Sequence, residues 1–324
     1  MAEQSRGEEV LLTGATGFVG GALYPVLEEA GYRVRCATRN PDRAAQRWPG
    51  RRWVELDVEV PSSVRTALEG CQKAYYLIHR MVDSPDFEER ETRAAMTFLD
   101  AATEAGVERI VYLGGIKPLA EPARHLRSRL VTGAILRSGE VTTVELRASM
   151  IIGPGSASWQ MVRDVATRLP VMLFPKWLNN RMEPVAIEDV TVALKAALEM
   201  EVDKSRWFAI PGPERLSFRE CIERVCDQIG NRPVMIGVPV LTPRLSSYWL
   251  RFVTGTDYHL ARALAEGLKD DLVAESDEFW ELIGHEDLMS YDEAVRRALS
   301  QEEPHRNAFE RAIHAAIGRE RSGQ

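Results

Sequence analysis

Residues whose types and spacing could hold a phosphate lie near the start of the chain, at Thr13-Gly14-Ala15-Thr16-Gly17-Phe18-Val19-Gly20. The three glycines have the spacing G-x-x-G-x-x-G, follow a short apolar run and precede an amphipathic stretch. In this context Gly14 permits a tight turn, Gly17 lets the backbone approach a pyrophosphate, and Gly20 lets a helix pack on a strand. The N-terminus of that helix attracts the anion. The segment predicts a dinucleotide-binding turn, and the alternative is a glycine-rich turn without a ligand. The expected cofactor contacts here are Gly14, Thr16, Gly17, Phe18, Val19 and Gly20.

The residues after the apolar runs at 33–37 and 53–56 indicate which nucleotide binds. NAD sites place an acidic residue about 20 residues beyond the glycines to hold the ribose hydroxyls, whereas this chain has Thr38-Arg39-Asn40. The planar guanidinium of Arg39 can pair with a 2′-phosphate, so we favour NADPH over NADH. The alternative for Arg39 is a solvated surface charge. Asp57, followed by Val58, is placed to meet the adenine amino group, or it simply forms a turn.

His125 and Arg129 could also act together in a reaction, because residues four apart share one face of a helix. Histidine can donate or accept a proton near neutral pH, whereas arginine stays charged. We therefore interpret His125 as a candidate general acid and Arg129 as a residue that holds the cofactor ribose or a developing oxyanion. The alternatives are a solvated basic stretch at the start of a helix, together with Arg124 and Arg127, or a cofactor clamp without chemistry.

The elements that must position these residues follow from alternating apolar runs and longer amphipathic stretches, which are typical of βαβ units. The expected strands are Val10–Leu12, Arg33–Ala37, Trp53–Leu56, Ala74–Ile78, Ile110–Leu113 and Thr143–Leu146. The expected helices between them are Gly20–Ala30, Ser63–Leu68, Phe87–Ala105 and Leu126–Ser138, three of which end at left-handed glycines, Gly31, Gly106 and Gly139. Right-handed crossovers then predict a doubly wound parallel-sheet α/β Rossmann fold. Arg147, at the end of its strand, would line the pocket at the carboxyl edge of the sheet.

The alternation of apolar runs and amphipathic stretches is interrupted at Gly153-Pro154-Gly155. It resumes with a helix at 189–200 and a strand at 207–210, and it ends at Pro211-Gly212-Pro213. We place the domain boundary there. Residues 8–212 form the nucleotide-binding domain, with 153–182 contributing to the substrate cleft, and 213–324 form a smaller, mainly helical substrate domain with one strand at 234–240. The aromatic segment 239–255 is interpreted first as a pocket lid, second as a homodimer contact and third as a peripheral membrane surface.

The glycine turn, Arg39, Asp57, Arg147 and Gly153-Pro154 together resemble the extended and atypical branches of the short-chain dehydrogenase/reductase superfamily, over about the first 210 residues. The superfamily's hydroxyl residue after the fifth strand is missing, since Leu113-Gly114-Gly115 stands there. His125-x-x-x-Arg129 stands where Tyr-x-x-x-Lys is usual, as in the atypical subgroup with NmrA-like relatives. The resemblance implies catalytic roles for His125 and Arg129, and cofactor contacts at Gly114 and Arg129. It also implies that Leu77, Ile78 and His79 lie beside the nicotinamide ribose, where related enzymes run their backbone, and the alternative for His79 is a structural role.

Composition excludes several function classes. A net charge of -7 and a pI near 5.6 argue against nucleic-acid binding. Four scattered cysteines are expected to be buried thiols in a reducing compartment, and no metal-ligand cluster is present. The polar first nine residues do not resemble a secretory signal, and no apolar run approaches the roughly 20 residues of a membrane span, so a cytoplasmic location is expected.

The leading hypothesis is an NADPH-dependent oxidoreductase that passes hydride to or from a small, apolar carbonyl or alcohol. The second is a non-catalytic NADPH-binding redox sensor or scaffold of the NmrA-like type, favoured by the missing Tyr-x-x-x-Lys. A membrane-peripheral accessory protein is the third.

Overall fold

A seven-stranded parallel sheet forms the centre of the computed structural model, which describes residues 7–79, 86–168, 171–231, 233–238 and 270–302. Its order is β11-β6-β5-β4-β1-β2-β3, and every neighbouring pair is parallel. The strands are β1 (Glu9–Leu12), β2 (Arg33–Thr38), β3 (Arg52–Glu55), β4 (Lys73–Tyr76), β5 (Arg109–Gly115), β6 (Thr142–Ala148) and β11 (Arg206–Ala209). This order reverses between β1 and β4, which confirms the predicted doubly wound fold and places the switch point beside the glycine turn.

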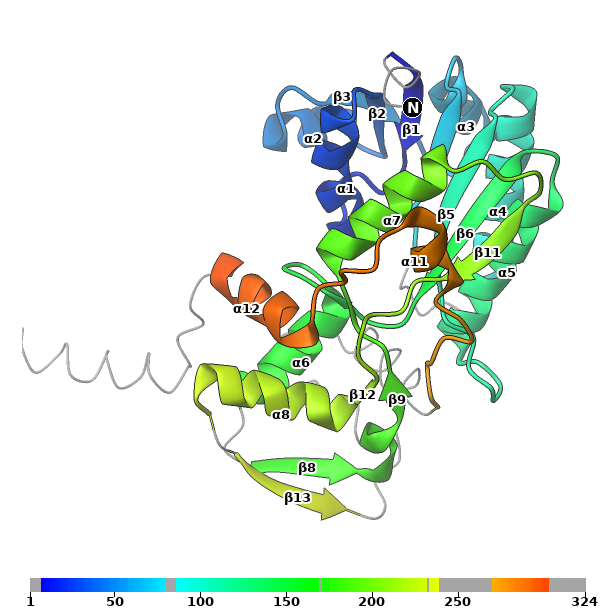
Figure 1. Cartoon of the computed structure of the whole chain (residues 1–324). Coiled ribbons are helices and arrows are strands. Elements are labelled where there is room, and N and C mark those ends of the chain that lie inside the picture. Colours follow the sequence, from blue (N-terminus) through cyan, green and yellow to red (C-terminus); the bar gives the residue numbers. More distant parts are fainter. Residues whose placement is uncertain (1–6, 80–85, 169–170, 232, 239–269, 303–324) are drawn as a thin grey trace, which may run out of the picture.

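Helices cover both faces of this sheet (Figure 1). On one face α1 (Phe18–Glu29) packs against α7 (Ile187–Glu199), and on the other α3 (Pro61–Leu68), α4 (Phe87–Glu104) and α5 (Arg124–Ser138) pack in sequence. The short helix α2 (Pro41–Arg47) was not predicted. It has only seven residues, and its start is fixed locally, because Asn40 Oδ1 accepts a hydrogen bond from the Arg43 amide at 3.0 Å.

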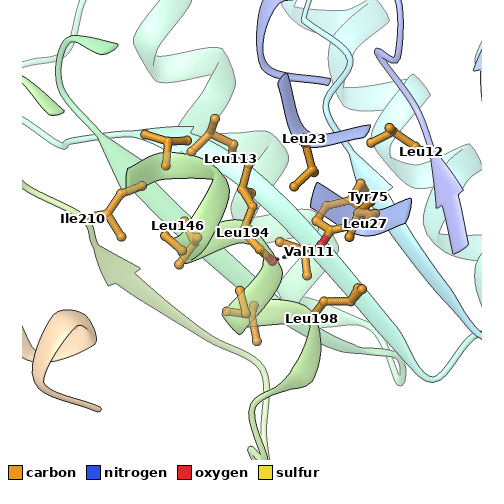
Figure 2. Packing of buried hydrophobic residues seen from close by; sticks show 14 of the residues in the cluster. Leu12, Leu23, Leu27, Tyr75, Val111, Leu113, Leu146, Leu194, Leu198 and Ile210 are labelled. Atoms are coloured by element: carbon orange, nitrogen blue, oxygen red, sulfur yellow. Dashed lines mark hydrogen bonds between the residues drawn. The ribbon is translucent and has the colours of Figure 1, made fainter. Parts of the chain in front are cut away.

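The core between the sheet and the pair α1 and α7 is built from strand residues that point to that face and from the inner faces of the two helices. Figure 2 shows this packing, in which Leu23 and Leu27 of α1 meet Leu194 and Leu198 of α7 over the sheet. Tyr75 of β4 is fully buried there, and its hydroxyl donates to the Leu194 carbonyl at 3.0 Å. Tyr75, Tyr76 and Tyr112 are all core residues.

Three helices were predicted to end at glycines that have a left-handed backbone. Gly31 and Gly106 have φ of +89° and +69°, so the left-handed endings predicted there are confirmed. The prediction for Gly139 is wrong, because its backbone is extended, with φ of −85°. Glycine is needed at this position for space instead, since a Cβ would lie 2.6 Å from Leu99 Cδ1.

A second, smaller core lies beyond the carboxyl edge of the sheet. It is formed by α6 (Ala157–Arg168), α8 (Phe218–Ile229) and α12 (Tyr291–Gln301), and its largest buried side chains include Trp159, Phe218 and Tyr291. The remaining elements around it are β7 (Ile151–Ile152), β8 (Val171–Pro175), η1 (Lys176–Asn179), β9 (Arg181–Met182), β10 (Val185–Ala186), β12 (Leu216–Ser217) and β13 (Val234–Val238).

The two cores alternate along the chain. After the small core, α11 (Glu278–Ile283) returns to the large one, where the Phe279 ring lies 5.2 Å from the Phe208 ring. Trp280 Nε1 donates to the Pro211 carbonyl at 2.9 Å. Residues on both sides of the expected 212/213 boundary therefore contribute to each core. The aromatic segment 239–255 lies outside the described residues, so its predicted roles are not addressed.

Charged groups at the amino edge of the sheet join three strands. Glu9 of β1 accepts hydrogen bonds from Arg35 Nε at 2.8 Å and from Arg52 Nη2 at 3.0 Å. Burial alone would raise the pKa of Glu9, but the hydrogen bonds from Arg52 and Arg35 outweigh it and lower that pKa.

Three sequence expectations can be compared directly with the described part of the chain. All four cysteines are buried and free, as predicted. Within the described residues, no helix has the length and apolar character needed to cross a bilayer. The same residues contain no cluster of three or more side chains suited to a metal ion.

Candidate functional site

The glycine turn after β1 is held against the end of β4. Thr13 Oγ1 donates to the Tyr75 carbonyl at 2.8 Å and accepts from the Leu77 amide at 2.8 Å. Gly14 has φ of +67°, and a Cβ there would lie 2.6 Å from the Leu77 carbonyl oxygen. A Cβ on Gly20 would overlap the Gly14 carbonyl. Glycine is required at both positions because the turn, helix α1 and strand β4 approach so closely.

The start of α1 suits a pyrophosphate group. Gly17 is the N-cap residue, no side chain caps the first turn, and that turn contains no acidic residue. The first amide N–H groups of a helix have no partner within the helix, and the helix dipole favours an anion there. This end of α1 therefore offers hydrogen-bond donors and positive potential at an exposed glycine backbone, the arrangement that a dinucleotide phosphate requires.

A cavity of about 450 Å³ extends from this turn along the carboxyl edge of the sheet to the small core. One wall comes from the turn, the residues after β4, the end of β5 and the first turns of α5, and the other comes from residues after β6 and from the small core. The residues of the first wall are Gly14, Gly17, Phe18, Val19, Gly20, Leu77, Ile78, His79, Tyr112, Leu113, Gly115, Ile116, His125, Leu126 and Arg129. The second wall includes Ser149, Met150, Ser156, Met161, Met182, Phe218 and Leu272.

Three basic side chains of the first wall meet at this cavity: His79, His125 and Arg129. Burial lowers the pKa of His79 well below its usual value, and the proximity of Arg129 and His125 lowers it further, so His79 is neutral at neutral pH. Arg129 Nη2 donates to the Leu113 carbonyl at 3.0 Å. Its Nε is buried and has no hydrogen-bond partner among the described residues. None of the described residues that line the cavity is acidic.

Tyr112 is close to this group without being a suitable proton donor. Its hydroxyl donates to the Arg129 carbonyl at 3.0 Å, which ties β5 to α5. Burial raises its pKa to about 12. Tyr112 is therefore best described as a support for the helix that carries His125 and Arg129.

Gly114, at the place of the superfamily hydroxyl residue, does not line the cavity. A Cβ on Gly114 would lie 2.9 Å from Glu145 Oε1 on the neighbouring strand. The fully buried carboxylate of Glu145 therefore occupies the space that a serine or threonine side chain would need. The contact of Gly114 with a cofactor stays a prediction.

The residues expected around the adenosine half lie outside the cavity. Arg39 is exposed at the end of β2 and forms no hydrogen bond or ion pair with a described residue. Asp57 Oδ1 accepts from the Glu59 amide at 3.0 Å, which is the turn-forming geometry considered as an alternative. Thr16 is exposed and Val58 is buried. These contacts also stay predictions.

Sequence reasoning assigned the range 153–182 to the substrate cleft without naming residues, and it missed Met150, Phe218 and Leu272 in the wall that the small core contributes. Met150, Met161, Met182, Phe218 and Leu272 come from five separate elements or loops, and no local motif marks them. Only the break at 153–155 signals that the chain leaves the sheet at this edge. Arg147, expected in this cavity, instead lines a neighbouring one.

Comparisons with known proteins agree with this geometry. A family model described as NAD(P)H-binding matches residues 14–156. Cinnamoyl-CoA reductase 1 of Petunia hybrida is 31% identical over 119 residues, which cover 34% of this chain and 36% of that protein. The corresponding enzyme of Arabidopsis thaliana is 28% identical over 119 residues, covering 34% and 35%. The chain thus matches about a third of the length of these curated relatives.

Two solved structures match almost the whole chain. Triphenylmethane reductase of Citrobacter sp., complexed with NADP(H), has a TM-score of 0.71 and 18% identity, and covers 90% of this chain and 99% of its own. The NADPH-dependent quinone oxidoreductase of Escherichia coli, complexed with NADPH, has a TM-score of 0.71 and 19% identity, with the same coverage. These matches confirm the Rossmann-like fold, and the family match supports an NAD(P)H-binding domain in residues 14–156.

Proposed function

We propose that this chain is an NADPH-dependent reductase that delivers hydride to the carbonyl carbon of a small apolar substrate. The observation that carries the proposal is the single cavity in which the glycine turn meets His125 and Arg129 opposite an apolar wall. The similar proteins are a cinnamoyl-CoA reductase, a triphenylmethane reductase and an NADPH-dependent quinone oxidoreductase, which supports an apolar, conjugated substrate.

The residues of the first wall fit the cofactor. The amides at the start of α1 would hold the pyrophosphate, and the backbone from Leu77 to His79 would lie along the nicotinamide ribose. Arg39 would pair with the 2′-phosphate, which NADH lacks. Bound in this way, NADPH supplies the hydride.

Two residues at the start of α5 would supply the proton and stabilise the negative charge on the substrate oxygen. His125 would donate its proton to the carbonyl oxygen while hydride reaches the carbon, so the substrate gains one hydride and one proton and becomes an alcohol. Arg129, whose side chain lines the same cavity, would stabilise the negative charge that develops on that oxygen. The methionine-rich second wall excludes water and adapts to an apolar substrate.

Steady-state reduction of a panel of aromatic aldehydes, ketones and quinones tests this function. His125→Ala should lower kcat/KM by about 10²- to 10⁴-fold, the usual range for a general acid, with little change in the Kd for NADPH. Arg127→Gln is the matched control, because Arg127 is an exposed cation on the same turn that pairs with Glu88 and Glu121. Turnover that survives His125→Ala unchanged would exclude His125 as the acid.

Cofactor choice is tested separately by fluorescence titration with NADPH and NADH. Arg39→Ser should weaken NADPH binding and leave NADH binding unchanged, because only NADPH carries the 2′-phosphate. Equal affinities in the parent protein would contradict the NADPH assignment.

The second candidate function is a non-catalytic NADPH sensor. It is favoured by Gly114, where the neighbouring Glu145 carboxylate leaves no room for the usual hydroxyl side chain. Tight NADPH binding without turnover over the whole panel would establish this alternative.

A further inference from the structure

A second cavity, of about 390 Å³, lies beside the first and is lined in part by residues of α5, β6 and the edge strand β11. Its walls are mostly apolar, and they carry two cations and one exposed indole. Its lining residues are Ile116, Lys117, Leu130, Arg147, Trp207, Ala209, Val273, Ala274 and Glu275. Ile116 also lines the first cavity, so the two are neighbours.

The cation Arg147 is held in this cavity by a buried carboxylate. Glu145 is fully buried and accepts from Arg147 Nε at 2.7 Å and from Arg137 Nε at 2.7 Å. Its carboxylate fits only because Gly114 and Gly133 lack a Cβ, which at either position would contact the Glu145 carboxylate oxygens. Residues of β5, β6 and α5 are thus arranged around one carboxylate that orients Arg147.

The charges of Glu145, Arg137 and Arg147 do not cancel. Arg137 alone neutralises Glu145, so Arg147 is an additional positive charge, and only 9% of its side chain is exposed. The Arg147 guanidinium lies 4.2 Å from the centre of the Trp207 ring, and its terminal nitrogens make no hydrogen bond with described residues. An excess buried cation costs free energy unless an anion accompanies it.

The rim adds a further positive charge. Lys117 lines the cavity and forms no ion pair with a described residue. Glu275 supplies the single acidic side chain among the described lining residues and is likewise without a described ion-pair partner. Lys117, Arg147 and Glu275 together leave one net positive charge, which matches a ligand with one negative charge.

We propose that this second cavity binds a free aromatic monocarboxylate. The carboxylate would lie between Arg147 and Lys117, where the guanidinium offers two terminal nitrogens. The ring would pack on the aliphatic wall that includes Ile116 and Leu130, beside the Trp207 indole whose face Arg147 covers. The proposal does not depend on the reductase activity, because the site lies outside the cavity that holds His125 and Arg129.

Calorimetric titration of the full chain with 2-naphthoate and with its neutral counterpart 2-naphthylmethanol tests the charge requirement. We expect naphthoate to bind at least about tenfold more tightly than the alcohol, and its affinity to fall as salt rises. Equal affinities for the two probes, or no naphthoate binding at millimolar concentration, would overturn the proposal.

Substitutions then locate the site. Lys117→Met should weaken naphthoate binding several-fold, whereas Lys204→Met, which removes an exposed lysine outside the lining, should not. Arg147→Met should abolish binding yet leave the chain folded, because Arg137 still neutralises Glu145. Ala274→Phe fills the cavity without changing its charge and should also abolish binding. Naphthoate affinity that survives both Lys117→Met and Ala274→Phe would exclude this cavity, and circular dichroism verifies that each variant is folded.

Discussion

Replacing Gly17 with alanine should weaken cofactor binding without disturbing the fold. The backbone at Gly17 has φ of −87° and ψ of 178°, which alanine adopts readily. The new Cβ would lie 3.2 Å from the Gly14 carbonyl oxygen, a tight contact. This cost is offset by the reduced freedom of the unfolded chain, so the free energy of unfolding should change by less than about 1 kcal/mol.

The effect on binding is much larger, because the methyl group would stand where the backbone has to approach the pyrophosphate. A hydrogen bond between an amide and a charged phosphate contributes about 1.5–3 kcal/mol. Losing one such bond corresponds to a roughly 10- to 100-fold higher Kd for NADPH. Fluorescence titration measures the Kd, and urea unfolding measures the stability.

Gly21→Ala is the matched control, since Gly21 lies in the same helix and a Cβ there meets nothing within 4 Å. This variant should gain up to about 1 kcal/mol of stability from helix propensity and keep its NADPH affinity. The reasoning is refuted if folded Gly17→Ala binds NADPH as tightly as the parent protein, or if both variants lose affinity equally.

Three further predictions concern stability. Gly133→Ala would push a methyl group onto the Glu145 carboxylate and should lower the free energy of unfolding by about 1–3 kcal/mol, measured in urea. Ser217→Ala removes the capping box that Ser217 forms with Glu220 at the start of α8, and a loss of about 1 kcal/mol should appear as a lower Tm. The folded pKa of Glu9 is lowered from 4.5, so its contribution is present above that pH and lost as the pH falls through the folded pKa. The stability difference between the parent and Glu9→Gln should therefore shrink on acidification, and a constant difference would contradict this assignment.

The sheet could be predicted from sequence because its signals are local. Each buried parallel strand is a short apolar run, and the glycine turn fixes how the first strand meets the first helix. The same local signals fail where tertiary contacts decide, as at Gly139, where space beside Leu99 rather than a left-handed backbone requires glycine. The short helix α2 (Pro41–Arg47) was missed because seven residues carry no clear apolar period.

The candidate site was predictable in more detail on one side than on the other. The glycine turn, Leu77–His79, His125 and Arg129 follow single strands or share one helix face, and the structure brings them to one cavity. For the opposite wall the sequence indicated only the range 153–182, because the positions of Met150, Phe218 and Leu272 depend on how the small core docks at the sheet edge. The displacement of Arg147 into the second cavity has the same origin, since neighbouring residues of a strand point to opposite faces.

The alternation of the two cores along the chain has a consequence for how the protein can be divided. Dividing the chain after residue 212 would remove the contact between Phe208 and Phe279 and would take Tyr291 out of the small core. The cut would thus divide both of the cores that border the cavity, so we expect the two halves of the cavity to unfold together. We therefore expect specificity to be altered more readily by substitutions within the intact fold than by exchanging the part of the chain after residue 212.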